Sequence, residues 1–158
     1  MNMQAIFTAC IAVAGTLLGS LATYIFQSRT AGRAQNFARA EQFRQERLTA
    51  YSTFAGAVLD LRSKQGARWG AKRRLPSDPV SYAEAKAAQV LSRTTAWQSL
   101  YRVRLVADGK DVTQLATAAM DLAADIDKIQ TLDELDGRMA EVRNAVERFI
   151  DEASKQVR

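Results

Sequence analysis

Residues 111–153 read DVTQLATAAMDLAADIDKIQTLDELDGRMAEVRNAVERFIDEA, and apolar residues recur through them at intervals of three and four. This spacing is typical of helices that pack along one apolar seam, as in a coiled coil or a helical bundle. The first run is Val112, Leu115, Ala119, Leu122, Ile126 and Ile129; the second, after a slip of one residue, is Leu132, Leu135, Met139, Val142, Val146, Phe149 and Ala153.

The slip between the two runs falls at Thr131, which is followed three residues later by Glu134. Thr and Glu at this spacing form a capping box, which marks the start of a helix. Either the chain turns here, which gives four helices, or one long helix is locally overwound, which gives three. Because of the capping box we favour the turn.

Two further helices precede this region. An apolar stripe at helical spacing runs through Phe37, Phe43, Leu48, Tyr51, Phe54, Ala55, Val58 and Leu61, and a Pro-containing break follows at residues 75–79. The next helix begins with a second capping box at Ser81 and Glu84 and ends at Asp108-Gly109. We therefore expect an all-α protein whose residues 45–158 form an antiparallel three- or four-helix bundle or coiled coil, with helices at about 37–68, 81–108, 111–130 and 131–157.

The N-terminal residues 5–26, AIFTACIAVAGTLLGSLATYIF, contain no charged side chain. A helix of this length reaches about 33 Å, which is enough to cross a hydrocarbon core of about 30 Å. The sequence thus predicts a transmembrane anchor at residues 1–27 and a basic helical stalk at 28–44. A cleaved signal peptide is disfavoured because no Lys or Arg precedes the apolar run, and a buried core helix is usually shorter.

One face of the predicted span carries small residues. Gly15 and Gly19 form a GxxxG pair, which lets two helix backbones approach closely in lipid. The face comprises Thr8, Ala12, Gly15, Gly19 and Thr23. We expect a homo-oligomer that forms through this transmembrane packing face; the alternatives are simple helix flexibility or packing against the span of another protein.

Basic residues follow the predicted span directly, namely Arg29, Arg33 and Arg39. Lys and Arg beside a span favour the cytoplasmic side, so we expect a single-pass protein of the cell membrane, with its N-terminus outside and its C-terminal domain in the cytoplasm. These arginines suit contact with the lipid bilayer surface. Nucleic acid is an unlikely partner, because the basic residues are spread around the helix and no recognised motif accompanies them.

The sequence contains no pattern of catalytic residues. It has no histidine, and its single cysteine, Cys10, lies in the predicted span. Nucleophile–base pairs with Cys or His are therefore excluded, and no glycine-rich phosphate-binding motif occurs. The acidic residues have the spacing of a solvated helix surface, although a carboxylate-only Mg²⁺ or Ca²⁺ site stays an alternative. We expect no enzyme activity, no cofactor and no bound metal.

One basic and aromatic stretch, residues 68–74, is a candidate partner loop. Trp69, Lys72, Arg73 and Arg74 could grip an acidic partner or lie at a lipid headgroup surface. The alternative, which we favour, is that Trp69 covers the end of the bundle while the charges beside it are solvated.

Residues 15–58, GTLLGSLATYIFQSRTAGRAQNFARAEQFRQERLTAYSTFAGAV, resemble uncharacterised small membrane proteins of high-GC bacteria. This resemblance implies an anchor followed by a helix but no known activity. The plan of the whole chain also resembles the inner-membrane spanins of phage lysis, which place their coil outside the membrane.

The function that we expect is a membrane-anchored, non-enzymatic helical scaffold or adaptor that binds an unknown protein partner at the cytoplasmic membrane face. One alternative is an envelope-facing coiled-coil protein, either spanin-like or associated with the cell wall. The other is a membrane-linked signal receiver.

Overall fold

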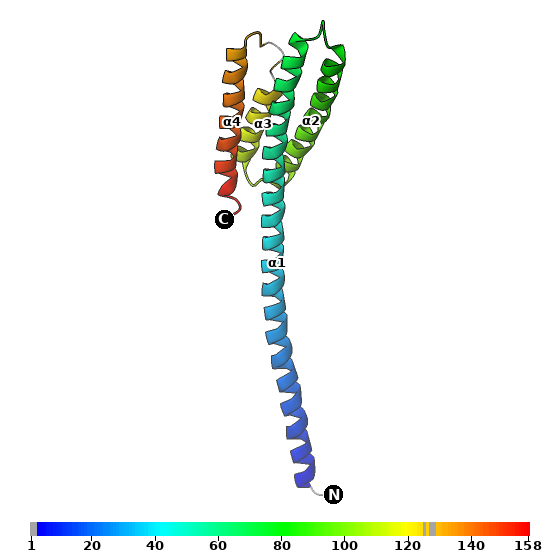
Figure 1. Ribbon diagram of the computed structural model, residues 1–158. Coiled ribbons are helices and arrows are strands. Elements are labelled where there is room, and N and C mark those ends of the chain that lie inside the picture. The colour runs from blue at the N-terminus through cyan, green and yellow to red at the C-terminus, as the bar shows by residue number, and fades with distance from the viewer. Residues whose placement is uncertain (1–2, 125, 127–128) are drawn as a thin grey trace. The chain divides into compact units, whose positions relative to one another are not determined.

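The computed structural model of the chain is all-α, with four helices and no strand in the part that it describes (Figure 1). The backbone is described for residues 3–124, 126 and 129–158, and the side chains for residues 19, 35 and 37 onward with the same two gaps. The helices are α1 (Met3–Arg73), α2 (Pro79–Val106), α3 (Lys110–Ala124) and α4 (Leu132–Ser154). The predicted all-α class is confirmed.

The chain divides into two compact units, residues 1–42 and 43–158. The first contains the N-terminal part of α1. In the second unit the remainder of α1 and helices α2, α3 and α4 lie side by side, and successive helices are joined at alternating ends (Figure 1). This up-and-down arrangement follows from short connections between neighbouring helices.

The core of the second unit is formed by buried apolar side chains from all four helices. Phe149 of α4 is fully buried, with its ring centroid 4.9 Å from that of Phe54 and 5.8 Å from that of Tyr51, both in edge-to-face geometry. Most of the predicted seam of α3 and α4 is buried as expected: Val112, Ala119, Ile126, Leu135, Val142, Val146, Phe149 and Ala153.

The chain turns at Thr131, as the capping box predicts. The Thr131 hydroxyl accepts a hydrogen bond from the backbone N–H of Glu134 at 3.2 Å, and the Glu134 carboxylate accepts bonds from the backbone N–H groups of Gln130 and Thr131. These backbone bonds favour the ionised carboxylate and hold the pKa of Glu134 below its usual value. The bundle therefore has four helices rather than three.

The end of the bundle at which α2 meets α3 is fastened by Gln156. Its side-chain carbonyl accepts hydrogen bonds from the Tyr51 hydroxyl at 2.6 Å and from the backbone N–H of Asp108 at 3.0 Å. Arg47 adds a bond from Nε to the Val106 carbonyl at 3.0 Å. Burial raises the pKa of Tyr51, an effect that the positive charge of Arg47 partly opposes.

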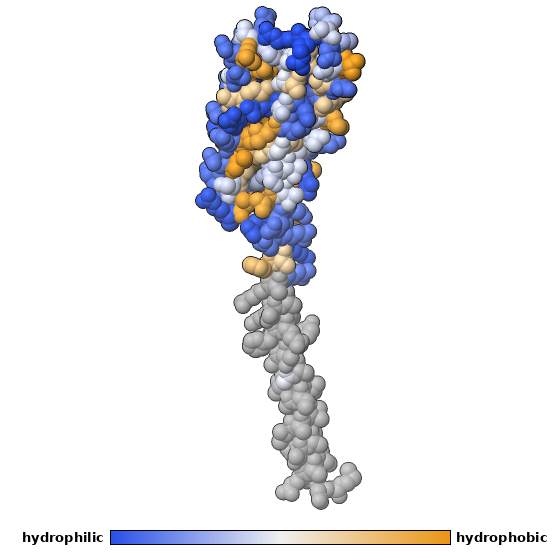
Figure 2. Space-filling view, viewed as in Figure 1, coloured by the Kyte–Doolittle hydropathy of each residue, from blue (hydrophilic) through white to orange (hydrophobic). Residues whose placement is uncertain are grey.

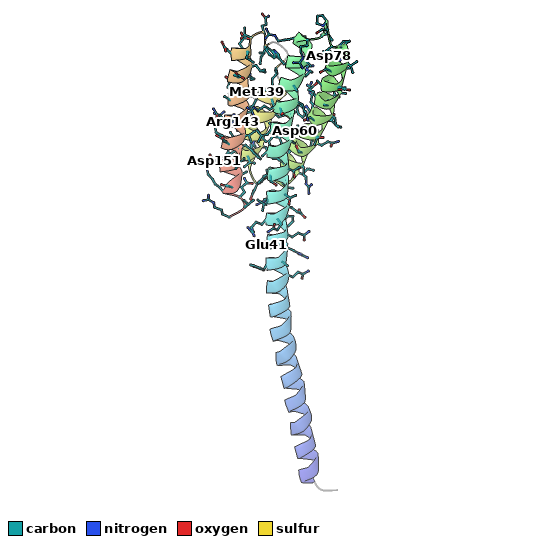
Figure 3. All side chains as sticks on the ribbon, viewed as in Figure 1. Glu41, Asp60, Asp78, Met139, Arg143 and Asp151 are labelled. Atoms are coloured by element: carbon teal, nitrogen blue, oxygen red, sulfur yellow. The ribbon has the colours of Figure 1, made fainter. Side chains whose placement is uncertain are left out.

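Three predicted helix ends are wrong. The third helix, expected at about 111–130, ends at Ala124. We expected the first bundle helix to end near residues 65–69, but α1 continues to Arg73. The start of α2 is at Pro79 rather than at a capping box on Ser81, because Asp78 is the N-cap and its carboxylate accepts a hydrogen bond from Ser81 N at 3.0 Å (Figure 3). Asp before Pro is a strong start signal, since Pro needs no N–H partner at the first helical position.

Several residues that the sequence places on apolar faces are exposed. Phe37 is 75 % exposed, Phe43 63 % and Leu48 45 %. Leu48 stands at the edge of a hollow between α1 and α4, which leaves its side chain partly open to solvent. Leu132 is 56 % exposed; it is the first residue of α4 and lies at the end of the apolar seam.

In the part of the chain that the structure describes, no helix is both long enough and apolar enough to cross a membrane. The side chains of the predicted span at residues 5–26 lie outside the described residues, apart from Gly19. The predicted anchor is thus a hypothesis that rests on the sequence.

Candidate functional site

A basic cleft lies at the end of the bundle where α1 finishes and α3 is connected to α4. Its volume is about 260 Å³. Five of the residues that line it belong to α1 and are spaced so that they share one helical face. The cleft is lined by Gln65, Arg68, Trp69, Lys72 and Arg73 of α1 and by Ile126, Ile129 and Gln130 of the connection.

Trp69 joins the two walls of the cleft. Its indole N–H donates a hydrogen bond to the backbone carbonyl of Ile129 at 3.0 Å. This bond satisfies a carbonyl in the α3–α4 connection, where no helix ladder is available to accept one. Trp69 therefore fastens the connection to α1, and the interpretation of this residue as a cover for the bundle end agrees with the geometry.

Arg73 stacks on the outer side of the same tryptophan. Its guanidinium carbon lies 4.6 Å from the centroid of the Trp69 ring, within the range of a cation–π contact. This contact holds the positive charge of Arg73 beside the indole, and Arg73 also lines the cleft. Lys72 is an exposed neighbour that brings a second positive charge.

Gln65 forms the floor of the cleft and is only 2 % exposed. Its amide nitrogen donates a long hydrogen bond of 3.4 Å to the Ala123 carbonyl, while its amide oxygen has no partner. A buried acceptor without a partner costs free energy, so this oxygen lowers the stability of the bundle end slightly.

The cleft suits an anionic group. Arg68, Lys72 and Arg73 supply positive charge, and the indole supplies an apolar wall. A carboxylate or phosphate matches the positive charge. No group of three or more His, Cys, Asp or Glu side chains gathers among the described residues in a way that could hold a metal ion.

The predicted partner loop is helical, since α1 contains three of its four residues. Trp69, Lys72 and Arg73 come together in the cleft, but Arg74 does not line it. Arg74 follows the last residue of α1, and its carbonyl accepts hydrogen bonds from the backbone N–H groups of Ser77 and Asp78 at 3.0 and 2.9 Å. Arg74 therefore helps to form the turn that leads into α2.

The other predicted sites lie largely outside the described side chains. These are the transmembrane packing face, of which only Gly19 is described, and the basic residues Arg29 and Arg33; Arg39 is described and exposed. A Cβ added at Gly19 would meet no atom within 4 Å in the chain itself.

A second hollow, an apolar groove of about 190 Å³, lies between α1 and α4 toward the other end of the bundle. Figure 2 shows hydrophobic residues gathered between these two helices. Leu48 and Ile150, which are 45 % and 46 % exposed, stand at its edges. The groove has almost no polar lining, so its character is opposite to that of the basic cleft.

In a comparison with protein families, the family model of the KilB plasmid transfer protein matches residues 48–157. The chain belongs to this family. No curated protein and no solved structure matches the chain. No membrane-protein family is matched, so the resemblance of residues 15–58 to small membrane proteins is only weakly supported.

The KilB match coincides with the bundle. It begins in α1 at Leu48, includes α2, α3 and α4, and ends after the last helix. Both hollows, the basic cleft and the apolar groove, lie within the matched residues. The family is therefore defined by the bundle, and functional residues are best sought there.

Several cleft residues were missed by sequence analysis. Gln65 has an ordinary place in a helix, and Ile129 acts through its backbone carbonyl, so neither carries a sequence signal. The spacing of residues 65, 68, 69, 72 and 73 was the available signal, but it is meaningful only if the helix continues past Gly66 and Gly70.

Proposed function

We propose that the chain is a membrane-anchored, non-enzymatic scaffold of plasmid transfer, which self-associates and binds a protein partner at the cytoplasmic membrane face. The observation that carries this proposal is the family match over residues 48–157, which accounts for nearly the whole bundle. The printed family name refers to plasmid transfer, and we extend that role to this chain.

The anchor and its orientation rest on the sequence. The uncharged run at residues 5–26 is long enough to span a bilayer, and Arg29, Arg33 and Arg39 follow it. The same run carries the packing face through which we propose that copies of the chain associate. An anchored bundle of this kind would hold its partner beside the membrane.

The basic cleft supports a binding role for the bundle. Its cations lie on one face of α1, and its aromatic wall is fixed by a hydrogen bond. These properties suit a recognition site for an acidic protein segment, whose carboxylates complement the positive charge.

The test is plasmid transfer from a donor whose copy of the gene is deleted. Full-length protein supplied in trans should restore transfer, whereas a chain that lacks residues 1–27 should not, since it cannot reach the membrane. Lys72→Glu with Arg73→Glu should reduce transfer through the loss of cleft charge. Transfer that is unchanged by the deletion would contradict the proposal.

The matched control for the cleft variant is Arg143→Glu with Arg148→Glu. Both arginines are exposed on α4 and neither lines the cleft, so the net charge changes equally without altering the site. Membrane fractionation of each variant, followed by immunoblotting, separates loss of binding from loss of the protein. Equal defects in the two double variants would argue against the cleft as the binding site.

A further inference from the structure

Helix α2 has a second apolar stripe on the side that faces away from the core. Its inner side is buried through Gln89, Ser92, Ala96, Ser99, Leu100 and Val103. On the other side Leu91 is 70 % exposed, Tyr101 54 % and Leu105 85 %. Figure 2 shows hydrophobic residues along this outer edge of α2. Large apolar side chains exposed to this extent on one helix indicate a contact surface.

The spacing of the outer stripe matches the seam of a helix pair. The stripe is formed by Ala87, Leu91, Thr94, Gln98, Tyr101 and Leu105, at successive intervals of four, three, four, three and four. These intervals keep all six residues on one side of the helix over five turns. A partner helix laid along α2 would cover them all.

The charge beside the outer stripe is mainly positive; the acidic exceptions are Glu84, before its first residue, and Asp121 of α3, which lines a hollow with Arg104. From Ala85 to Val106 the helix carries four basic residues, namely Lys86, Arg93, Arg102 and Arg104, and no acidic one. Arg104 is held beside the stripe, since it donates a hydrogen bond to the Thr117 hydroxyl at 3.1 Å and its guanidinium lies 5.9 Å from the Tyr101 ring. Arg102 lies on the other flank of the same turn.

We propose that the outer stripe of α2 docks an amphipathic helix of a partner protein, with an apolar seam flanked by Asp and Glu. The exposed Leu91, Tyr101 and Leu105 supply the apolar contact, and the basic flanks select the acidic partner. A second copy of α2 fits less well, because beside its stripe it carries mainly basic residues and lacks the acidic ones that would complement them.

This inference rests on the proposed function only in assuming that the bundle binds a protein. The test uses the full chain in nanodiscs of phosphatidylcholine and a designed four-heptad peptide with Leu at the seam positions and Glu on both flanks. A second peptide, with Lys in place of Glu, reports on charge selection. Binding is measured by fluorescence anisotropy of the labelled peptides at low and high salt.

The acidic peptide should bind, and its Kd should rise with salt because the flanking charges are exposed. Leu91→Glu with Leu105→Glu should weaken binding by about tenfold or more, since two leucines lose their apolar contact. Both residues are exposed, so the fold should be retained, as circular dichroism will show. The control Leu132→Glu changes an exposed leucine on α4 and should leave the Kd unchanged.

Three results would overturn the proposal. The first is equal affinity for the acidic and basic peptides, and the second is an equal effect of the α2 variant and the Leu132→Glu control. The third is no peptide binding at all. If neither peptide binds and the α2 variant no longer binds phosphatidylglycerol vesicles, the outer stripe is a membrane contact. If neither peptide binds and the oligomeric state of the α2 variant changes, the outer stripe binds a second copy of the chain. Because the readout is binding in vitro, it does not depend on whether deletion affects plasmid transfer.

Discussion

Phe149 is the residue whose surroundings depend most directly on the four-helix packing. It is fully buried, and its ring meets Tyr51 and Phe54 of α1 edge to face. Phe149→Ala should lower the free energy of unfolding by about 3–5 kcal/mol, because it removes the ring and leaves a cavity. Chemical denaturation of the full chain in mild detergent, followed by circular dichroism, measures this loss.

Phe43→Ala is the matched control for that substitution, since Phe43 is 63 % exposed in the same unit. Its effect should be within about 0.5 kcal/mol, as for most surface changes. A similar loss in both variants would mean that the aromatic contacts do not form the core.

Protonation of Glu134 should lower the stability of the bundle at acidic pH. Its pKa in the folded chain lies below the ordinary value of 4.5, because backbone N–H groups of Gln130 and Thr131 bond to the ionised form. The stabilisation is therefore present above pH 4.5 and is lost as the pH falls through the lowered pKa. Glu134→Gln keeps a capping-box residue without the ionisable group, so acidification should destabilise this variant less than the wild type. Equal acid sensitivity in urea titrations at several pH values would contradict this assignment.

At the scale of the element, α1 shows why sequence patterns located the helices better than their ends. The sequence predicts an end near residues 65–69, yet α1 continues to Arg73. A Cβ at Gly66 would lie 3.0 Å from the terminal methyl of Met139 on α4, so this glycine serves a close approach between helices (Figure 3). Such a requirement depends on the partner helix and is invisible in the local sequence. The capping box at Thr131 was predictable because both of its bonds are local.

Two glycines outside that contact should respond to alanine with opposite signs. Gly137 lies within α4, and a Cβ there would meet nothing within 4 Å, so Gly137→Ala should stabilise the bundle by about 0.5–1 kcal/mol. Gly109, between α2 and α3, has φ of +91°, which strains an alanine, so Gly109→Ala should destabilise by about 1 kcal/mol or more. Thermal unfolding of the two variants compares them directly, and changes of the same sign would be inconsistent with the fold.

At the scale of the whole molecule, the cleft was predictable in part. Composition identified Trp69, Lys72 and Arg73, because aromatic and basic residues stand together in the sequence. Their arrangement was not predictable, because it depends on the α3–α4 connection reaching the end of α1 and accepting the bond from Trp69. The outer stripe of α2 was missed because the inner face of that helix already accounted for its pattern.

The proposed self-association through the predicted span can be tested on the full chain. Gly15→Ile with Gly19→Ile should abolish dimerisation in a membrane two-hybrid assay, because bulky side chains keep the two backbones apart. A Cβ added at Gly19 meets no atom of the chain itself within 4 Å, so we expect the effect to arise between copies. Leu17→Ile with Leu18→Ile, on the opposite face, is the control. An unchanged signal in the glycine variant would remove the span from the proposed oligomer.

The central claim is that the bundle of this KilB-family chain is held at the cytoplasmic face of a membrane. The most direct measurement is a reporter fused after Arg158 that is active only in the cytoplasm, combined with membrane fractionation of the fusion. The account predicts an active reporter in the membrane fraction. A silent reporter, with activity from a second reporter that works only outside the cytoplasm, would contradict the orientation argued from Arg29, Arg33 and Arg39.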